Sequence, residues 1–133
     1  MTAPSRKLNI GVVGLGRMGQ RHALNILHHV PWARLHSVCS VALHEIQWAK
    51  DNLEPEGVII FSDYDQMVRT KGLEAVVIAS PTAMHVEHTL SAIEQGVHAL
   101  CEKPVTTDLS SVSPIFHSCG RCYLGQKANT LFF

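Results

Sequence analysis

The chain has 133 residues, of which 46% are hydrophobic, and its formal net charge is zero. This length suits one domain with one core, and the apolar content excludes a chain that is disordered over most of its length. The neutral balance gives no basic field for nucleic acid or a membrane surface, and no apolar run is long enough to span a bilayer. Residues 1–7 lack the apolar core of a signal peptide, so we expect a cytoplasmic protein.

Strand-like and helix-like patterns alternate along residues 8–101. Apolar, β-branched runs are typical of parallel strands buried on both faces, and apolar residues at helical spacing separate them. Alternation at this rhythm predicts an α/β fold with a doubly wound parallel sheet. The expected strands are Leu8–Val13, Arg34–Cys39, Val58–Phe61, Ala75–Ala79 and Val97–Cys101, and the expected helices are Gln20–Val30, Leu43–Asn52, Asp63–Thr70 (with Ser62 or Asp63 as N-cap) and Ala83–Gln95.

A glycine-rich turn, Gly14-Leu15-Gly16-Arg17-Met18-Gly19, joins the first expected strand to the first helix. In a G-x-G-x-x-G turn in this context, Gly14 permits the tight turn, Gly16 lets a diphosphate reach the backbone, and Gly19 lets helix and strand pack closely. Phosphates then meet free N–H groups and the positive end of the helix dipole. The pattern predicts a dinucleotide site formed by residues 14–19 of a Rossmann fold.

The alternating pattern fails after Asp108. Serines crowd the following segment and Pro114 interrupts any helix, so we divide the chain into a domain of residues 1–109 and an atypical tail of residues 110–133. In that tail, Cys119 and Cys122 form a C-x-x-C pair that could be a redox pair or half of a zinc site. With His117 the pair would give zinc three ligands, but a fourth is not evident. A redox pair would need a strand-to-helix turn, which the surrounding pattern does not offer, so we interpret the pair as incidental. The other two cysteines, Cys39 and Cys101, fall inside expected strands and are predicted to be small core residues.

Several segments match one known family in chain order: the glycine turn, Phe61-Ser62-Asp63-Tyr64, Ala79-Ser80-Pro81-Thr82-Ala83-Met84-His85, and Glu102-Lys103-Pro104 followed by Val105-Thr106-Thr107-Asp108. On these residues the chain resembles the N-terminal half of the glucose–fructose oxidoreductase and inositol dehydrogenase (Gfo/Idh/MocA) family. The matching segments span roughly four-fifths of the chain, and their agreement in order is more specific than any one motif.

The resemblance implies an activity and a cofactor. Members are typically two-domain enzymes that use NAD or NADP to oxidise or reduce a hydroxyl of a sugar, cyclitol or similar molecule, and they can form oligomers. By the same resemblance Lys103 is the catalytic or substrate-orienting residue at the nicotinamide end, and Glu102 lines the cofactor pocket. A partly desolvated lysine beside a cationic nicotinamide can have a lowered pKa and take part in proton transfer. The Lys103–Pro104 peptide bond is expected to be cis.

Ser80, Pro81 and Thr82 form the loop at the carboxyl end of the fourth strand, where α/β sheets meet their cofactor. Thr82 could equally be only a helix N-cap. His85 matches the family's histidine at the start of the next helix, with a polar residue of no chemical role as the alternative. His85 and His88 are spaced like metal ligands, but no third ligand is evident, so we expect no metal there.

The end of the second strand departs from the usual pattern. Ser40 stands where dinucleotide sites often place an Asp or Glu that holds the adenosine ribose hydroxyls. A hydroxyl can donate to the 2′-phosphate of NADP, which a carboxylate would repel. Arg17 and His44 are the nearest basic residues. The expected cofactor is therefore NAD or NADP, with NADP slightly favoured.

A second departure follows residue 108, where the family continues with a helix, a sixth strand and a substrate domain. We interpret the tail here as an altered C-terminus and expect the fifth strand to have an open edge. Hydride transfer needs donor and acceptor at near-attack distance in a water-poor pocket, so little or no dehydrogenase activity is expected of this chain alone. One alternative is a non-catalytic module that holds a dinucleotide or associates with other subunits, and a small metal or redox protein built on the tail is the least favoured.

Overall fold

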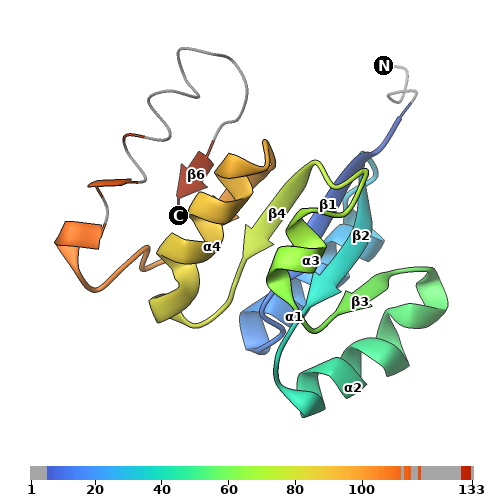
Figure 1. Ribbon diagram of the computed structural model, residues 1–133. Coiled ribbons are helices and arrows are strands. Elements are labelled where there is room, and N and C mark those ends of the chain that lie inside the picture. The colour runs from blue at the N-terminus through green and yellow to red at the C-terminus, as the bar shows by residue number, and fades with distance from the viewer. Residues whose placement is uncertain (1–5, 112, 115–116, 118–129, 133) are drawn as a thin grey trace.

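A six-stranded parallel sheet forms the centre of the computed structural model, with strand order β3-β2-β1-β4-β5-β6 (Figure 1). The structure describes residues 6–111, 113–114, 117 and 130–132. The strands are β1 (Leu8–Val13), β2 (Ala33–Cys39), β3 (Ile59–Phe61), β4 (Ala75–Ile78), β5 (His98–Cys101) and β6 (Thr130–Phe132). Strand order reverses between β1 and β4, so the carboxyl ends of these two strands mark the place where a ligand is expected.

The helices connect successive strands, as the alternation predicted. They are α1 (Arg17–His29), α2 (Leu43–Asn52), α3 (Tyr64–Val68) and α4 (His85–Glu94), with short 3-10 turns η1 (Glu54–Glu56), η2 (Thr82–Met84) and η3 (Leu109–Ser111). Asp63 caps α3, since its Oδ1 accepts the backbone N–H of Asp65 at 3.0 Å. Within the described part of the chain, no helix has the length and apolar character that crossing a membrane requires.

Two apolar clusters cover the two faces of the sheet. One contains residues of α1 and α2, and the other contains residues of α3 and α4. Neighbouring strand residues alternate between the clusters: Val76 and Ile78 belong to the second and Val77 to the first. This is the double winding that the sequence predicted. Cys39 and Cys101 are buried in the second cluster, also as predicted, and burial raises the pKa of the Cys39 thiol to about 12.

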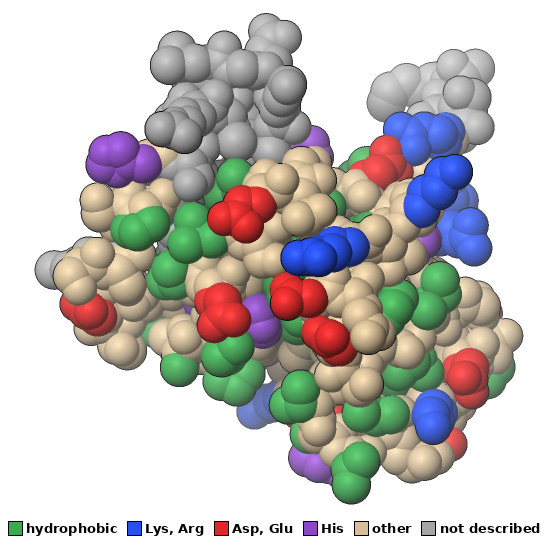
Figure 2. All heavy atoms as spheres, viewed as in Figure 1, with side chains coloured by type: hydrophobic (Ala, Val, Ile, Leu, Met, Phe, Trp, Pro, Cys, Tyr) green, Lys and Arg blue, Asp and Glu red, His purple; other side chains and the backbone are tan. Residues whose placement is uncertain are grey.

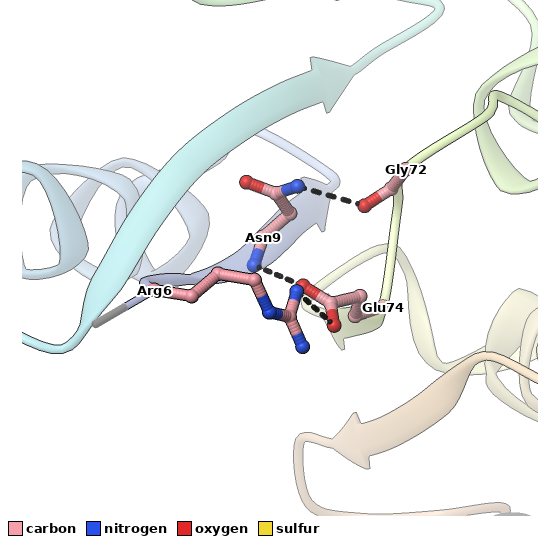
Figure 3. Close-up of polar contacts among 4 residues, drawn as sticks. All are labelled: Arg6, Asn9, Gly72 and Glu74. Carbon is pink, nitrogen blue, oxygen red and sulfur yellow. Dashed lines mark hydrogen bonds and ion pairs between the residues drawn. The ribbon is translucent and has the colours of Figure 1, made fainter. Parts of the chain in front are cut away.

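A polar cluster joins β1 to the segment before β4 at the end of the sheet opposite the glycine turn (Figure 3). Glu74 accepts the backbone N–H of Asn9 at 2.9 Å and pairs with Arg6 at 2.7 Å. The side-chain amide of Asn9 donates to the carbonyl oxygen of Gly72 at 2.9 Å. These bonds align the beginnings of the two central strands.

The sixth strand corrects one expectation. The five expected strands are all present, but the expected open edge on β5 is wrong, because residues Thr130–Phe132 pair in parallel with Ala99–Cys101. A three-residue segment is too short to show a hydrophobic period, and pairing at a sheet edge requires only backbone N–H and C=O groups. Cys119 and Cys122, and hence the C-x-x-C interpretation, lie outside the described residues.

Candidate dinucleotide site

Two glycines of the turn are required by close backbone contacts. Gly14 has φ +85°, and a Cβ at this position would lie 2.5 Å from the carbonyl oxygen of Ala79. A Cβ on Gly19 would lie 1.7 Å from the carbonyl oxygen of Gly14. Larger residues would force the turn away from β4 or lift α1 from the sheet. These glycines therefore have the structural roles that the motif predicted.

Gly16 is different, because it is exposed and faces open space. It is the N-cap of the 13-residue α1, and the nearest atom to a Cβ placed on it is Glu45 Oε1 at 3.7 Å. The first turn of α1 has no acidic residue, so its N–H groups and helix dipole favour an anion. Arg17 and Met18 are exposed in this turn, whereas the Leu15 side chain is fully buried beneath it. A diphosphate fits this cradle.

A cavity of about 430 Å³ opens beside the turn, at the carboxyl ends of β1, β2 and β4. Apolar walls with a few polar groups suit a purine and its ribose. Its lining includes the predicted site residues Gly14, Gly16, Ser40, Ser80 and Pro81. It also includes residues that were not among the predicted site residues: Val41, Ala42, Glu45, Tyr64, Met84 and His88.

A carboxylate lies beside the end of β2, where the sequence predicted none. Ser40 Oγ donates a short hydrogen bond to Glu45 Oε2, and the backbone N–H of Leu15 donates to the same oxygen at 3.2 Å. Ser40 does stand at the end of β2, as predicted, but α2 brings an acid back to it five residues later. Glu45 belongs to no motif, and its only sequence signal is its place in the first turn of α2.

His85 connects the loop after β4 to the loop after β5. His85 Nε2 contacts the carbonyl oxygen of Ser80 at 2.7 Å, and His85 Nδ1 contacts that of Pro104 at 2.8 Å. Both ring nitrogens of His85 are thus engaged by backbone carbonyl oxygens of this chain. His85, which is 2% exposed, therefore has no nitrogen left for a cofactor or metal in this conformation. Its predicted cofactor contact stays a prediction.

His88, unlike His85, lines the cavity. Its Nδ1 lies 2.9 Å from Ser80 Oγ, and its ring lies tilted by 39° against the ring of Tyr64, with 4.2 Å between the centroids. Burial lowers the pKa of His88, so the neutral ring is favoured. Among the described residues, no group of three or more His, Cys, Asp or Glu could hold a metal ion.

Glu102 and Lys103 follow β5 and lie outside the cavity lining. Glu102 Oε1 is 2.5 Å from His22 Nε2 of α1, and this hydrogen bond lowers the pKa of the Glu102 carboxyl. Lys103 is exposed, and its peptide bond to Pro104 is cis, as expected. Pro81 is the N-cap of η2 and Met84 that of α4, so the N-cap alternative for Thr82 does not hold.

The turn, its open helix terminus and the cavity at the strand-order reversal define a Rossmann-type dinucleotide-binding domain. The chain belongs to the Gfo/Idh/MocA oxidoreductase family with an NAD-binding Rossmann fold, whose family model matches residues 8–121. This match continues past residue 109, and the division of the chain at that residue stays a prediction.

Relatives in the family include inositol dehydrogenases. The chain is 37% identical over 127 residues to inositol 2-dehydrogenase of Rubrobacter xylanophilus, covering 96% of this chain and 35% of that protein. It is 34% identical, with a TM-score of 0.82, to the structure of scyllo-inositol dehydrogenase from Lactobacillus casei with bound NAD(H) and scyllo-inositol, covering 96% of this chain and 36% of that one. The chain thus spans about a third of the length of the curated relatives it matches.

Proposed function

We propose that this chain is the NAD(P)-binding part of an oxidoreductase that transfers hydride between a nicotinamide cofactor and a hydroxyl of a sugar, cyclitol or similar molecule. The observation that carries the proposal is the open cradle at Gly16, at the N-terminus of α1 and on the wall of the 430 Å³ cavity. The relative from Lactobacillus casei, which binds NAD(H) and scyllo-inositol, supports the cofactor and substrate class.

The chain's own residues then have distinct tasks. N–H groups at the start of α1 hold the diphosphate, and the loop of Ser80, Pro81 and Thr82 borders the path of the cofactor toward β5. The nicotinamide supplies or accepts the hydride when bound. Lys103 orients the substrate hydroxyl and moves its proton, and Glu102 keeps the end of β5 against α1 through His22.

Substrate turnover is expected to need more than these residues. The relatives are about three times as long as this chain, and reaction requires substrate held at near-attack distance. We therefore expect nicotinamide binding with little or no turnover of polyols by this chain alone. We do not favour the alternative of subunit association through an open β5 edge, because β6 pairs with β5.

Gly16→Ala tests the proposal because it fills the cradle without straining the fold. The added methyl meets only Glu45 Oε1, at ordinary contact distance. By isothermal calorimetry we expect the unaltered chain to bind NAD⁺ or NADP⁺, and Gly16→Ala to weaken binding about tenfold or more. The melting temperature should fall only slightly, because alanine is a poorer N-cap than glycine.

Gly57→Ala is the matched control, since it adds the same methyl at the C-cap of η1, away from the cavity. It is expected to lower the melting temperature and to leave the dissociation constants unchanged. The proposal is overturned if the folded, unaltered chain gives no heat with millimolar NAD⁺, NADH, NADP⁺ or NADPH.

A further inference from the structure

We infer that Glu45 does the work of the carboxylate missing from the end of β2: it receives the adenosine ribose hydroxyls and excludes a 2′-phosphate, so that the site selects NAD(H) over NADP(H). This inference rests on the proposed function, because it presumes that a dinucleotide binds. It reverses the preference for NADP that the sequence suggested.

The placement of the Glu45 carboxylate is set by two elements. Oε2 accepts from the backbone N–H of Leu15, in the glycine turn, and from the hydroxyl of Ser40, at the end of β2. Oε1 is the atom nearest to a Cβ built on Gly16. The carboxylate therefore lies between the diphosphate cradle and the end of β2, which is where a dinucleotide on this fold places its adenosine ribose.

The chemistry around the Glu45 carboxylate favours a hydroxyl over a phosphate. Both hydrogen bonds go to Oε2, so Oε1 keeps lone pairs for a donor. A ribose hydroxyl can donate to it, whereas a phosphate group offers only negative oxygens and is repelled.

The preference for NADP depended on a free Ser40 hydroxyl, and this hydroxyl is engaged. Its one hydrogen goes to Glu45, and its oxygen accepts the backbone N–H of Ala42 at 3.1 Å. Ser40 is therefore not available to donate to a phosphate. Arg17 and His44, the two basic candidates that the sequence offered for a 2′-phosphate, line neither the main cavity nor its neighbour.

More acidic groups border the same cavity. A smaller hollow of about 250 Å³ adjoins it and shares Val41, Tyr64, Met84 and His88 with it. The lining of this hollow adds Asp63, Asp65 and Glu87, and acidic side chains gather over α3 and α4 on the face seen in Figure 2. Among the described residues that line the two hollows there is no Lys or Arg. The local field therefore also opposes two extra negative charges.

Dissociation constants for NAD⁺ and NADP⁺, measured by calorimetry on the unaltered chain and on Glu45→Gln, test the inference. We expect the unaltered chain to bind NAD⁺ at least about tenfold more tightly. Glu45→Gln removes the charge at constant shape and should shrink this ratio about tenfold, chiefly by tightening NADP⁺ binding. The control Glu56→Gln changes an exposed acid of η1 outside both hollows and should leave the ratio unchanged.

The outcomes separate the two proposals. Equal or tighter binding of NADP⁺ by the unaltered chain, or an unchanged ratio in folded Glu45→Gln, overturns the role of Glu45 and leaves the proposed function standing. Binding of neither nucleotide overturns both. If Glu45→Gln does not fold, the unaltered chain still decides: the ratio must fall as salt rises from low to high, because salt screens charge repulsion, and a ratio independent of salt contradicts the inference.

Discussion

His85 Nδ1 lies 2.8 Å from the carbonyl oxygen of Pro104, which ties the first residue of α4 to the loop after β5. The other ring nitrogen holds the carbonyl oxygen of Ser80 at 2.7 Å. One buried side chain thus joins two loops at the carboxyl edge of the sheet, and Lys103 directly precedes Pro104 in one of these loops. The position of the proposed catalytic lysine depends on this link.

His85→Ala should therefore loosen the loop after β5. It removes two hydrogen bonds and leaves two carbonyl oxygens without their partner, so we expect a loss of about 2–4 kcal/mol of unfolding free energy. Urea unfolding measures this loss, and amide hydrogen exchange should show faster exchange at Thr106–Asp108. The exposed His44→Ala is the control. Unchanged stability and exchange in His85→Ala would contradict the link.

Substitutions at Gly19 and Gly57 should separate the cost of a close contact from the cost of backbone strain. Gly19→Ala places a methyl 1.7 Å from the Gly14 carbonyl oxygen, whereas Gly57→Ala meets nothing within 4 Å and is strained only by φ +83°. We expect Gly19→Ala to cost more than about 3 kcal/mol or to prevent folding, and Gly57→Ala to cost about 1 kcal/mol. Denaturant unfolding compares them, and equal midpoints would show that α1 can move away from the turn.

Stability should fall between pH 7.5 and 5.5 because of His88. Burial lowers its pKa from the ordinary value of 6.5, the nearby His85 lowers it further, and Glu87 and Asp65 partly oppose the shift. The unfolded chain then binds a proton more readily than the folded one, so the stability present above pH 6.5 is lost on acidification through 6.5 toward the folded-state pKa. The pKa of His36 is also lowered, mainly by burial.

His88→Asn tests the contribution of this one residue. Asparagine can keep the hydrogen bond to Ser80 Oγ but cannot take up a proton. Unfolding free energies at the two pH values should show a smaller loss for His88→Asn than for the unaltered chain. The pKa values of Glu74 and Glu102 are lowered from 4.5, so these groups act below this window. Identical losses in both proteins would rule out His88 as the source.

Glu74 should matter more as a backbone acceptor than as an ion-pair partner. The backbone N–H of Asn9 is the first cause of its lowered pKa and the Arg6 side chain the second, and Arg6 is 72% exposed. Glu74→Gln keeps an acceptor for Asn9, so its unfolding midpoint should fall less than that of Glu74→Ala and resemble that of Arg6→Ala. Since the pKa of Glu74 is lowered, the stability that the Glu74 carboxylate brings is lost only as pH falls below 4.5. Glu74→Gln should therefore reduce the pH dependence of the unfolding free energy below pH 4.5. A larger effect of Arg6→Ala than of Glu74→Ala would contradict the ranking.

Local patterns in the sequence predicted the features that depend on neighbouring residues. The bounds of β1 and α2 agree with expectation at both ends, since an apolar run before a glycine turn and a helical period leave little choice. The roles of Gly14 and Gly19 follow from the same context. The beginning of α1 was expected three residues late, because a glycine-rich first turn has no helical signal of its own.

By itself the sequence determined the alternation of strands and helices, the glycine turn and the family, because each of these depends on residues that are close along the chain. Only the tertiary structure decided which distant groups meet. It brought Glu45 back to Ser40 and Leu15, joined His85 to Pro104 and added β6 to the sheet edge. Such contacts depend on the packing of helices against a common sheet and on backbone pairing, neither of which leaves a periodic mark in the amino-acid order.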